Sequence, residues 1–207
     1  MRRNRLWWFV LPIALWVLSS TAPQASTVMQ LNLDEMVRRA DRIYRGTVLS
    51  VGAESVAAGG GQLPVTVYRL RVDEAFRGDF PEMKGVRIAE IRTLGKAAAV
   101  RVGTVKSAVV LPRMPELEVG RSYLVLGTRP SAIGLSTTVG LGQGLFQISS
   151  VGKDEAAVND VNNAGLFRGM AAPPARSARQ AIEGAGAGGG AIRYADLADR
   201  IRGLAAR

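Results

Sequence analysis

The residue types that the chain lacks limit its catalytic chemistry. It contains no cysteine and no histidine, which excludes a thiol nucleophile, a histidine general base and a disulfide. A zinc site would have to be built from carboxylates alone. The one adjacent lysine and serine, Lys106 and Ser107, would point to opposite faces of a strand and would not share a proton. We therefore predict that the protein is not an enzyme and needs no cofactor.

Oxygen-rich and glycine-rich segments do not predict a ligand site either. Asp73 and Glu74 are adjacent carboxylates, but alternation along a strand would keep them from facing one substrate. Segment 153–163 is rich in Asp, Glu and Asn without the spacing of a calcium loop, so a polar turn is expected. The run Gly140–Gly144 lacks a following Lys-Ser or Lys-Thr and precedes a strand, which predicts a tight β-turn rather than a phosphate loop.

The candidate ligand-binding face is a set of arginines. Arg69 and Arg71 alternate with apolar residues, so in a strand they would point together to solvent. Arg45 would join them if the first two strands pair in register. OB-type barrels commonly bind ligands along an exposed strand face. The alternative is that these arginines only keep the sheet hydrated and cover apolar neighbours with their stems.

The charge balance is compatible with several anionic partners. The chain carries 27 basic and 17 acidic residues, a net charge of +10. Such a balance suits an anionic glycan, lipopolysaccharide, nucleic acid or an acidic protein. The charges are dispersed among apolar residues, without the interleaved aromatic residues of proteins that stack on bases. We therefore do not expect nucleic acid as a partner.

Residues 1–25 have the pattern of a signal peptide. Three arginines precede the apolar run Leu6–Leu18, which is 13 residues long, and a membrane span needs roughly 20. We expect cleavage after Ala25, export to the periplasm or the extracellular medium, and no stable membrane span afterwards. An uncleaved anchor is the alternative. Loss of the three arginines would lower the net charge from +10 to +7, and the lack of cysteine favours a bacterial envelope protein.

Segment 31–168 is predicted to form one mainly β domain. A short helix would end near Ala40, with Asn32 and Glu35 as a capping box. Segments 43–51 and 65–76 are rich in β-branched and aromatic residues and indicate a long hairpin around a flexible loop at 57–62. Further strands are expected at 85–92, 108–111, 121–128 and 144–149.

These short strands, separated by glycine and proline turns, predict an antiparallel OB-like barrel over about 43–149. The uninterrupted apolar run Tyr123–Leu126 indicates a central strand that is covered on both faces. The expected core residues are Tyr68, Leu70, Val72, Leu124 and Leu126.

The composition changes beyond residue 168. Residues 169–192 are rich in proline, glycine and alanine and are predicted to form a tether. Residues 193–206 have the pattern of an amphipathic helix. Three alternatives stay open for this tethered C-terminal helix: it binds a partner, folds back on the barrel, or frays.

Four segments carry motifs of interest: Ala40–Val48 (ADRIYRGTV), Tyr68–Gly78 (YRLRVDEAFRG), Met114–Leu126 (MPELEVGRSYLVL) and Gly140–Phe146 (GLGQGLF). They resemble a group of exported bacterial proteins of unassigned role, and their order is similar to that of the netrin-like module, an OB-type barrel found in tissue inhibitors of metalloproteinases. The resemblance covers about residues 31–168. Those inhibitors chelate the protease zinc through an N-terminal cysteine, which this chain lacks.

The sequence predicts an exported, non-catalytic binding or accessory module of the bacterial envelope or secretome. One alternative is a secreted inhibitor or chaperone of a metalloprotease. A further alternative is an envelope protein that binds anionic glycan.

Overall fold

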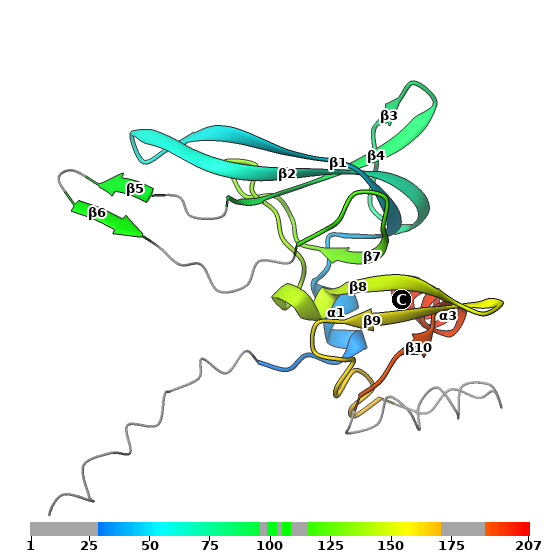
Figure 1. Cartoon of the computed structure of the whole chain (residues 1–207). Coiled ribbons are helices and arrows are strands. Elements are labelled where there is room, and N and C mark those ends of the chain that lie inside the picture. Colours follow the sequence, from blue (N-terminus) through cyan, green and yellow to red (C-terminus); the bar gives the residue numbers. More distant parts are fainter. Residues whose placement is uncertain (1–28, 96–98, 103–104, 109–115, 171–188) are drawn as a thin grey trace, which may run out of the picture.

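A computed structural model describes residues 29–95, 99–102, 105–108, 116–170 and 189–207. The predicted signal peptide, most of the predicted tether and the side chains of Lys106 and Ser107 lie outside the described residues. These described residues form a mainly β fold and include two α-helices (Figure 1). Helix α1 spans Leu33–Arg39 and helix α3 spans Tyr194–Ala205.

Eight strands form one antiparallel sheet in the order β10-β9-β8-β7-β1-β2-β4-β3, and β5 pairs separately with β6. Their bounds are β1 Arg42–Ala58, β2 Gly61–Arg77, β3 Glu82–Met83, β4 Val86–Leu94, β5 Ala99–Val102, β6 Val105–Ala108, β7 Ser122–Gly127, β8 Leu145–Val151, β9 Asp154–Asn159 and β10 Ile192–Arg193.

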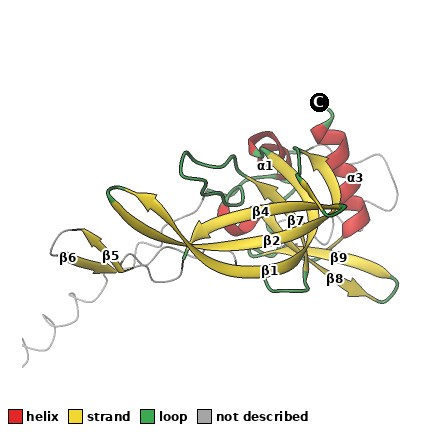
Figure 2. Cartoon of the chain, turned by 90° about the horizontal axis from the view of Figure 1, so that it is seen from above, coloured by secondary structure: helices red, strands yellow, loops and turns green. Residues whose placement is uncertain are grey.

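The sheet is not closed into a barrel, which corrects the prediction from the sequence. Closure requires the first and last strands to run side by side over several residues. Here the two edge strands, β10 and β3, have two residues each and do not pair with each other. The helices cover part of the sheet instead of a closing strand pair (Figure 2).

The predicted hairpin is present, but its strands are longer than expected. Pairing of β1 with β2 continues to Ala58 opposite Gly61, so the expected flexible loop at 57–62 is mostly strand. The turn consists of Gly59 and Gly60, with φ angles of 58° and 77°. Two consecutive positive φ values are typical of a type I′ turn, whose twist matches the paired strands and favours glycine. The glycines therefore tighten the hairpin rather than loosen it.

The interior consists of two apolar clusters on opposite faces of β7. Leu124 and Leu126 pack in a helix-side core that includes residues of α1 and α3. Tyr123 and Val125 belong to a strand-side core with residues of β1, β2 and β4. The prediction of a strand covered on both faces is confirmed. The expected core residues are all buried, with Tyr68, Leu70 and Val72 in the strand-side core.

Both helices pack on the sheet from the same side. Asn32 caps α1 through its bond with the Glu35 backbone N–H, and the Glu35 carboxylate accepts from the Asn32 N–H, as the capping box predicted. The C-terminal helix folds back on the sheet, which was one of the three alternatives for it. Leu197 and Ile201 of α3 are fully buried in the helix-side core.

Candidate interaction surface

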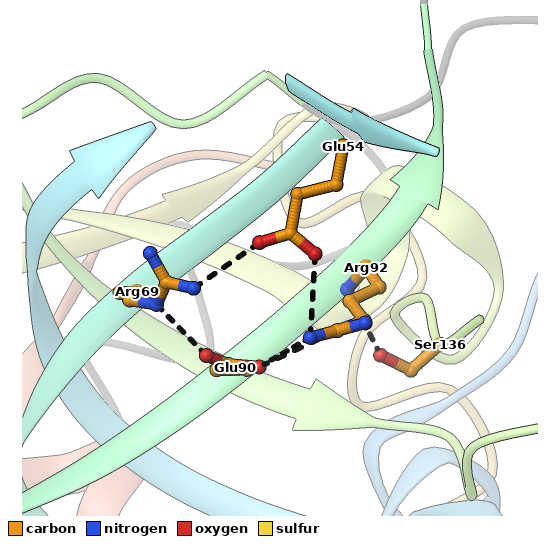
Figure 3. Close-up of polar contacts among 5 residues, drawn as sticks. All are labelled: Glu54, Arg69, Glu90, Arg92 and Ser136. Atoms are coloured by element: carbon orange, nitrogen blue, oxygen red, sulfur yellow. Dashed lines mark hydrogen bonds and ion pairs between the residues drawn. The ribbon is translucent and has the colours of Figure 1, made fainter. Parts of the chain in front are cut away.

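Arg69 lies on an exposed face of β2 within a network of four charged side chains (Figure 3). Its guanidinium donates to Glu90 of β4 at 2.8 Å and to Glu54 of β1 at 3.2 Å. Arg92 of β4 reaches the second oxygen of each carboxylate, at 3.3 Å from Glu90 and 3.5 Å from Glu54. The register of β2 and β4 brings these side chains together, because Arg69 lies directly opposite Glu90. Each carboxylate therefore bridges two arginines.

The charges of this network cancel. Partial burial would raise the pKa of Glu90, but hydrogen bonds from Arg69 and Arg92 outweigh it and hold the pKa below its usual value. Two carboxylates thus face two guanidinium groups in this network. The Arg69 side chain is 45% exposed. An anionic ligand would nevertheless have to compete with the carboxylates of Glu54 and Glu90, which already bind it.

Arg71 shares the exposed face with Arg69, as the alternation predicted, and is also ion-paired. Its Nε donates to Asp73 at 2.7 Å. The other oxygen of Asp73 accepts from the Thr47 hydroxyl at 2.7 Å, and that hydroxyl lies 2.9 Å from the Ser122 hydroxyl. These contacts join β2, β1 and β7 across the surface. Whether Arg69 and Arg71 also bind a ligand stays a prediction.

Arg45 has a different environment from the other two candidate arginines. Two of its nitrogens donate to the two carboxylate oxygens of Glu155 on β9, each at 2.7 Å. The guanidinium carbon also lies 4.7 Å from the centre of the Tyr194 ring at the start of α3, a cation–π distance. The bond with Glu155 raises the pKa of Arg45 and lowers that of Glu155. Arg45 thus links β1 to the C-terminal end of the chain.

The Tyr194 hydroxyl continues these contacts to β2. It donates to Glu74 at 2.6 Å, and Arg202 of α3 forms an ion pair with the same carboxylate. Partial burial would raise the pKa of Glu74, but bonds from Tyr194 and Arg202 outweigh it and lower the pKa. We call Arg45, Glu155, Tyr194, Glu74 and Arg202 the polar belt. It connects α3 to strands β1, β2 and β9.

Segment 153–163 contributes to a buried polar cluster that its composition did not predict. That segment contains strand β9 rather than only a turn, which corrects the prediction. Asn159 and Asn163 bond each other's backbone N–H through their side-chain oxygens, at 2.7 and 3.1 Å. Asn163 also donates to the Gly190 carbonyl at 2.7 Å, and Asn159 donates to the Gln143 carbonyl at 2.9 Å.

Gln143, in the glycine-rich run, holds the N-terminal segment. Its side chain accepts from the Leu31 N–H at 2.9 Å and donates to the Met29 carbonyl at 3.0 Å. The run forms a short 3-10 helix, Leu141–Gly144, rather than a β-turn. The expected close backbone approach is present, since a Cβ on Gly144 would lie 2.5 Å from the Val139 carbonyl oxygen. The signal that sequence reasoning missed is a lone glutamine among glycines, which fits an amide that bonds backbone groups.

The described part of the chain shows no further cluster with obvious chemistry. Within it, no group of three or more acidic side chains is placed to hold a metal ion. Among its helices, none is long and apolar enough to cross a membrane. Comparison of the chain with models of protein families, with curated proteins and with solved structures finds no match.

Proposed function

We propose that the protein is an exported, non-catalytic binding or accessory module of the bacterial envelope or secretome. The basic, short apolar N-terminus supports export. The absence of cysteine and histidine supports a non-catalytic role, because it removes the commonest nucleophile and general base.

The observation that carries the binding role is an extension of the sheet beyond β7, which we call the arm and define as residues 49–64. Strand β1 is its edge, and the arm is two-stranded only beyond Val65 toward the turn, where the pairing of β2 with β4 ends. Beyond Val48, strand β1 no longer pairs with β7, and among the described residues it pairs only with β2. Figure 1 shows this hairpin reaching past β7. Leu49 and Val51 of the arm are 47% and 43% exposed. A projecting hairpin with exposed apolar side chains promotes aggregation, so its presence favours a role in binding.

The OB-like, netrin-like assignment is part of this proposal. Its support is the set of four sequence motifs and the antiparallel strand order, without barrel closure. A metalloprotease inhibitor of the known cysteine type is less well supported. The residues after the predicted cleavage site lead directly to Met29 and Leu31, which Gln143 binds to the core. The glycan alternative is weakened by the carboxylates that already pair with Arg69 and Arg71.

The test is to express the tagged full chain in a bacterial host and recover it from each cell fraction. We expect an intact mass that corresponds to a start near Ser26, and recovery outside the cytoplasm. Capture from periplasm and culture medium should enrich specific proteins over a tag-only control. A membrane-bound product that retains residues 1–25 would contradict export, and capture equal to the control would contradict a binding role.

A further inference from the structure

The arm carries an open edge of backbone hydrogen-bonding groups. Along an antiparallel pair, successive residues direct their N–H and C=O groups alternately toward the partner and away from it. Val48 directs both groups away from β2, since its N–H donates to the Arg121 carbonyl and its carbonyl accepts from the Gly120 N–H. Beyond Val48, no described residue outside β2 pairs with β1. Beyond Val48, the outward N–H and C=O groups of β1 therefore form a sheet edge that no described strand pairs with.

Two further observations show which residues of β1 face that edge. Ala58 and Gly61 flank the two-residue turn, and in such hairpins the flanking pair is hydrogen-bonded. Alternation from this pair makes Ala57, Ser55, Ala53 and Val51 the outward residues. Independently, the Pro64 carbonyl accepts from Gly95 on the far side of β2. Pro64 therefore does not bond Ser55, its partner in register, and Ser55 faces outward.

The sequence of this edge lacks the features that normally prevent strand addition. Natural edge strands are protected by lysine, proline, bulges or short length. Residues 51–58 contain no basic residue and no proline. Their one charged residue, Glu54, is already paired with Arg69 and Arg92. The segment also has no register shift against β2 beyond Ser50. It presents a regular, nearly uncharged template.

We propose, on the basis of the binding function inferred above, that the outer edge of β1 at residues 51–57 binds an extended polypeptide segment of a partner protein by β-strand addition. Backbone groups at alternate residues provide the affinity in this binding mode, and side-chain contacts provide selectivity. The exposed Leu49 and Val51 favour apolar residues at one end of the bound segment. The net positive charge of the chain favours a segment with acidic flanks.

A second copy of this chain fits the edge less well. Two copies would each bring a net charge of +7 to +10 and repel each other, whereas an acidic segment is attracted. The proposed partner is thus a different polypeptide, with alternating apolar residues and acidic ends.

Amide exchange of the full chain without a partner tests the geometry first. The amides of Val51, Ala53, Ser55 and Ala57 should exchange much faster than those of Ser50, Gly52, Glu54 and Val56, because only the second set donates to β2. Equal protection of both sets would overturn the proposal, because the edge would then already be occupied.

The probe for binding is a synthetic peptide with alternating valine and threonine at its centre and two glutamates at each end. Its binding to the full chain is followed by fluorescence anisotropy, and it should slow exchange at the four outward amides. The substitution Ala53→Pro removes one outward N–H and places a ring on the edge without breaking the ladder to β2, so affinity should fall by about tenfold or more. Ala53→Val keeps the N–H and should bind within about twofold of the unmodified chain.

Three results would overturn strand addition: no binding of the peptide, equal binding by the two Ala53 variants, or protection at other amides. Protection that grows with protein concentration alone would assign the edge to a second copy instead. Should Ala53→Pro fail to fold, the exchange data on the unmodified chain decide. If cell fractions still contain specifically captured proteins while the peptide does not bind, the binding module stands and only its edge assignment fails.

Discussion

The two halves of strand β1 lie in different environments, and similar residues are buried in one half and exposed in the other. In its first half, Ile43 and Tyr44 are fully buried, whereas Leu49 and Val51 in the arm are 47% and 43% exposed. All four residues are hydrophobic, and the strand is continuous. What differs is the neighbouring structure, because β7 and the helices cover the first half and only β2 accompanies the second. Burial in this protein follows from what packs on a strand, not from the strand's own composition.

The two regions should also differ in what stabilises them. The helix-covered end has a continuous apolar core, a buried amide cluster and the polar belt of α3. The arm has backbone pairing with β2, a tight glycine turn and an ion-pair network at its base. Matched substitutions in the two regions can therefore break or sharpen the comparison.

The largest expected difference concerns leucine. Leu124→Ala removes a fully buried side chain from the helix-side core and should lower the free energy of unfolding by about 2–5 kcal/mol. Leu49→Ala, in the exposed part of β1, should change it by less than about 0.5 kcal/mol. Chemical denaturation of both variants measures this. A loss under about 0.5 kcal/mol for Leu124→Ala would place β7 at the surface.

The second comparison uses glutamine. Gln143→Ala leaves the Leu31 N–H and the Met29 carbonyl without the partners they have now, and should cost about 1–3 kcal/mol of unfolding free energy. Gln62→Ala, next to the turn of the arm and exposed, should be near neutral. Equal effects on the denaturation midpoint would show that the N-terminal segment does not depend on Gln143.

The third prediction concerns acid. The pKa values of Glu74 and Glu155 are lowered from 4.5 in the folded protein, so their bonds stabilise the fold above the usual carboxylate range and are lost as the pH falls through the lowered values. Acidification below pH 4.5 should therefore lower the protection factors of the amides in α3, relative to the intrinsic exchange rate at each pH. Tyr194→Phe removes one bond to Glu74 and should cost about 1 kcal/mol at neutral pH.

The control for the acid effect is Glu155→Gln, which removes a titrating group that bonds Arg45. The protection factors in α3 should depend less on pH in this variant. Unchanged pH dependence in both variants would show that the polar belt does not hold the helix.

The smallest expected effect is at the arginines of the exposed face. Replacing Arg69 and Arg71 with Gln should leave the free energy of unfolding almost unchanged, because exposed ion pairs contribute little. Since carboxylates already pair with both side chains, we expect the affinity for an anionic glycan to stay unchanged at two salt concentrations. A weaker affinity with a flatter salt dependence would instead establish these arginines as a binding site.

Local pattern determined much of the fold from the sequence by itself. The capping box of α1, the alternation in β2 and the apolar run of β7 each predicted what the structure contains, because they depend on residues close in the chain. The limits on catalysis also come from composition alone, through the absence of cysteine and histidine. Gly59 and Gly60 were visible in the sequence, yet their effect depends on the strands that they join.

Contacts between distant residues were decided only by the tertiary structure. Alternation predicted that Arg69 would be exposed, but pairing with Glu54 and Glu90 required the register of three strands. Leu70 and Leu124 were both expected in one core, and they lie in different cores on opposite faces of the sheet. Strand order decides whether the sheet closes into a barrel, where α3 packs and which edge of the arm is open. The periodicity of the sequence does not encode strand order, because it indicates the face on which a residue lies and not the strand beside it.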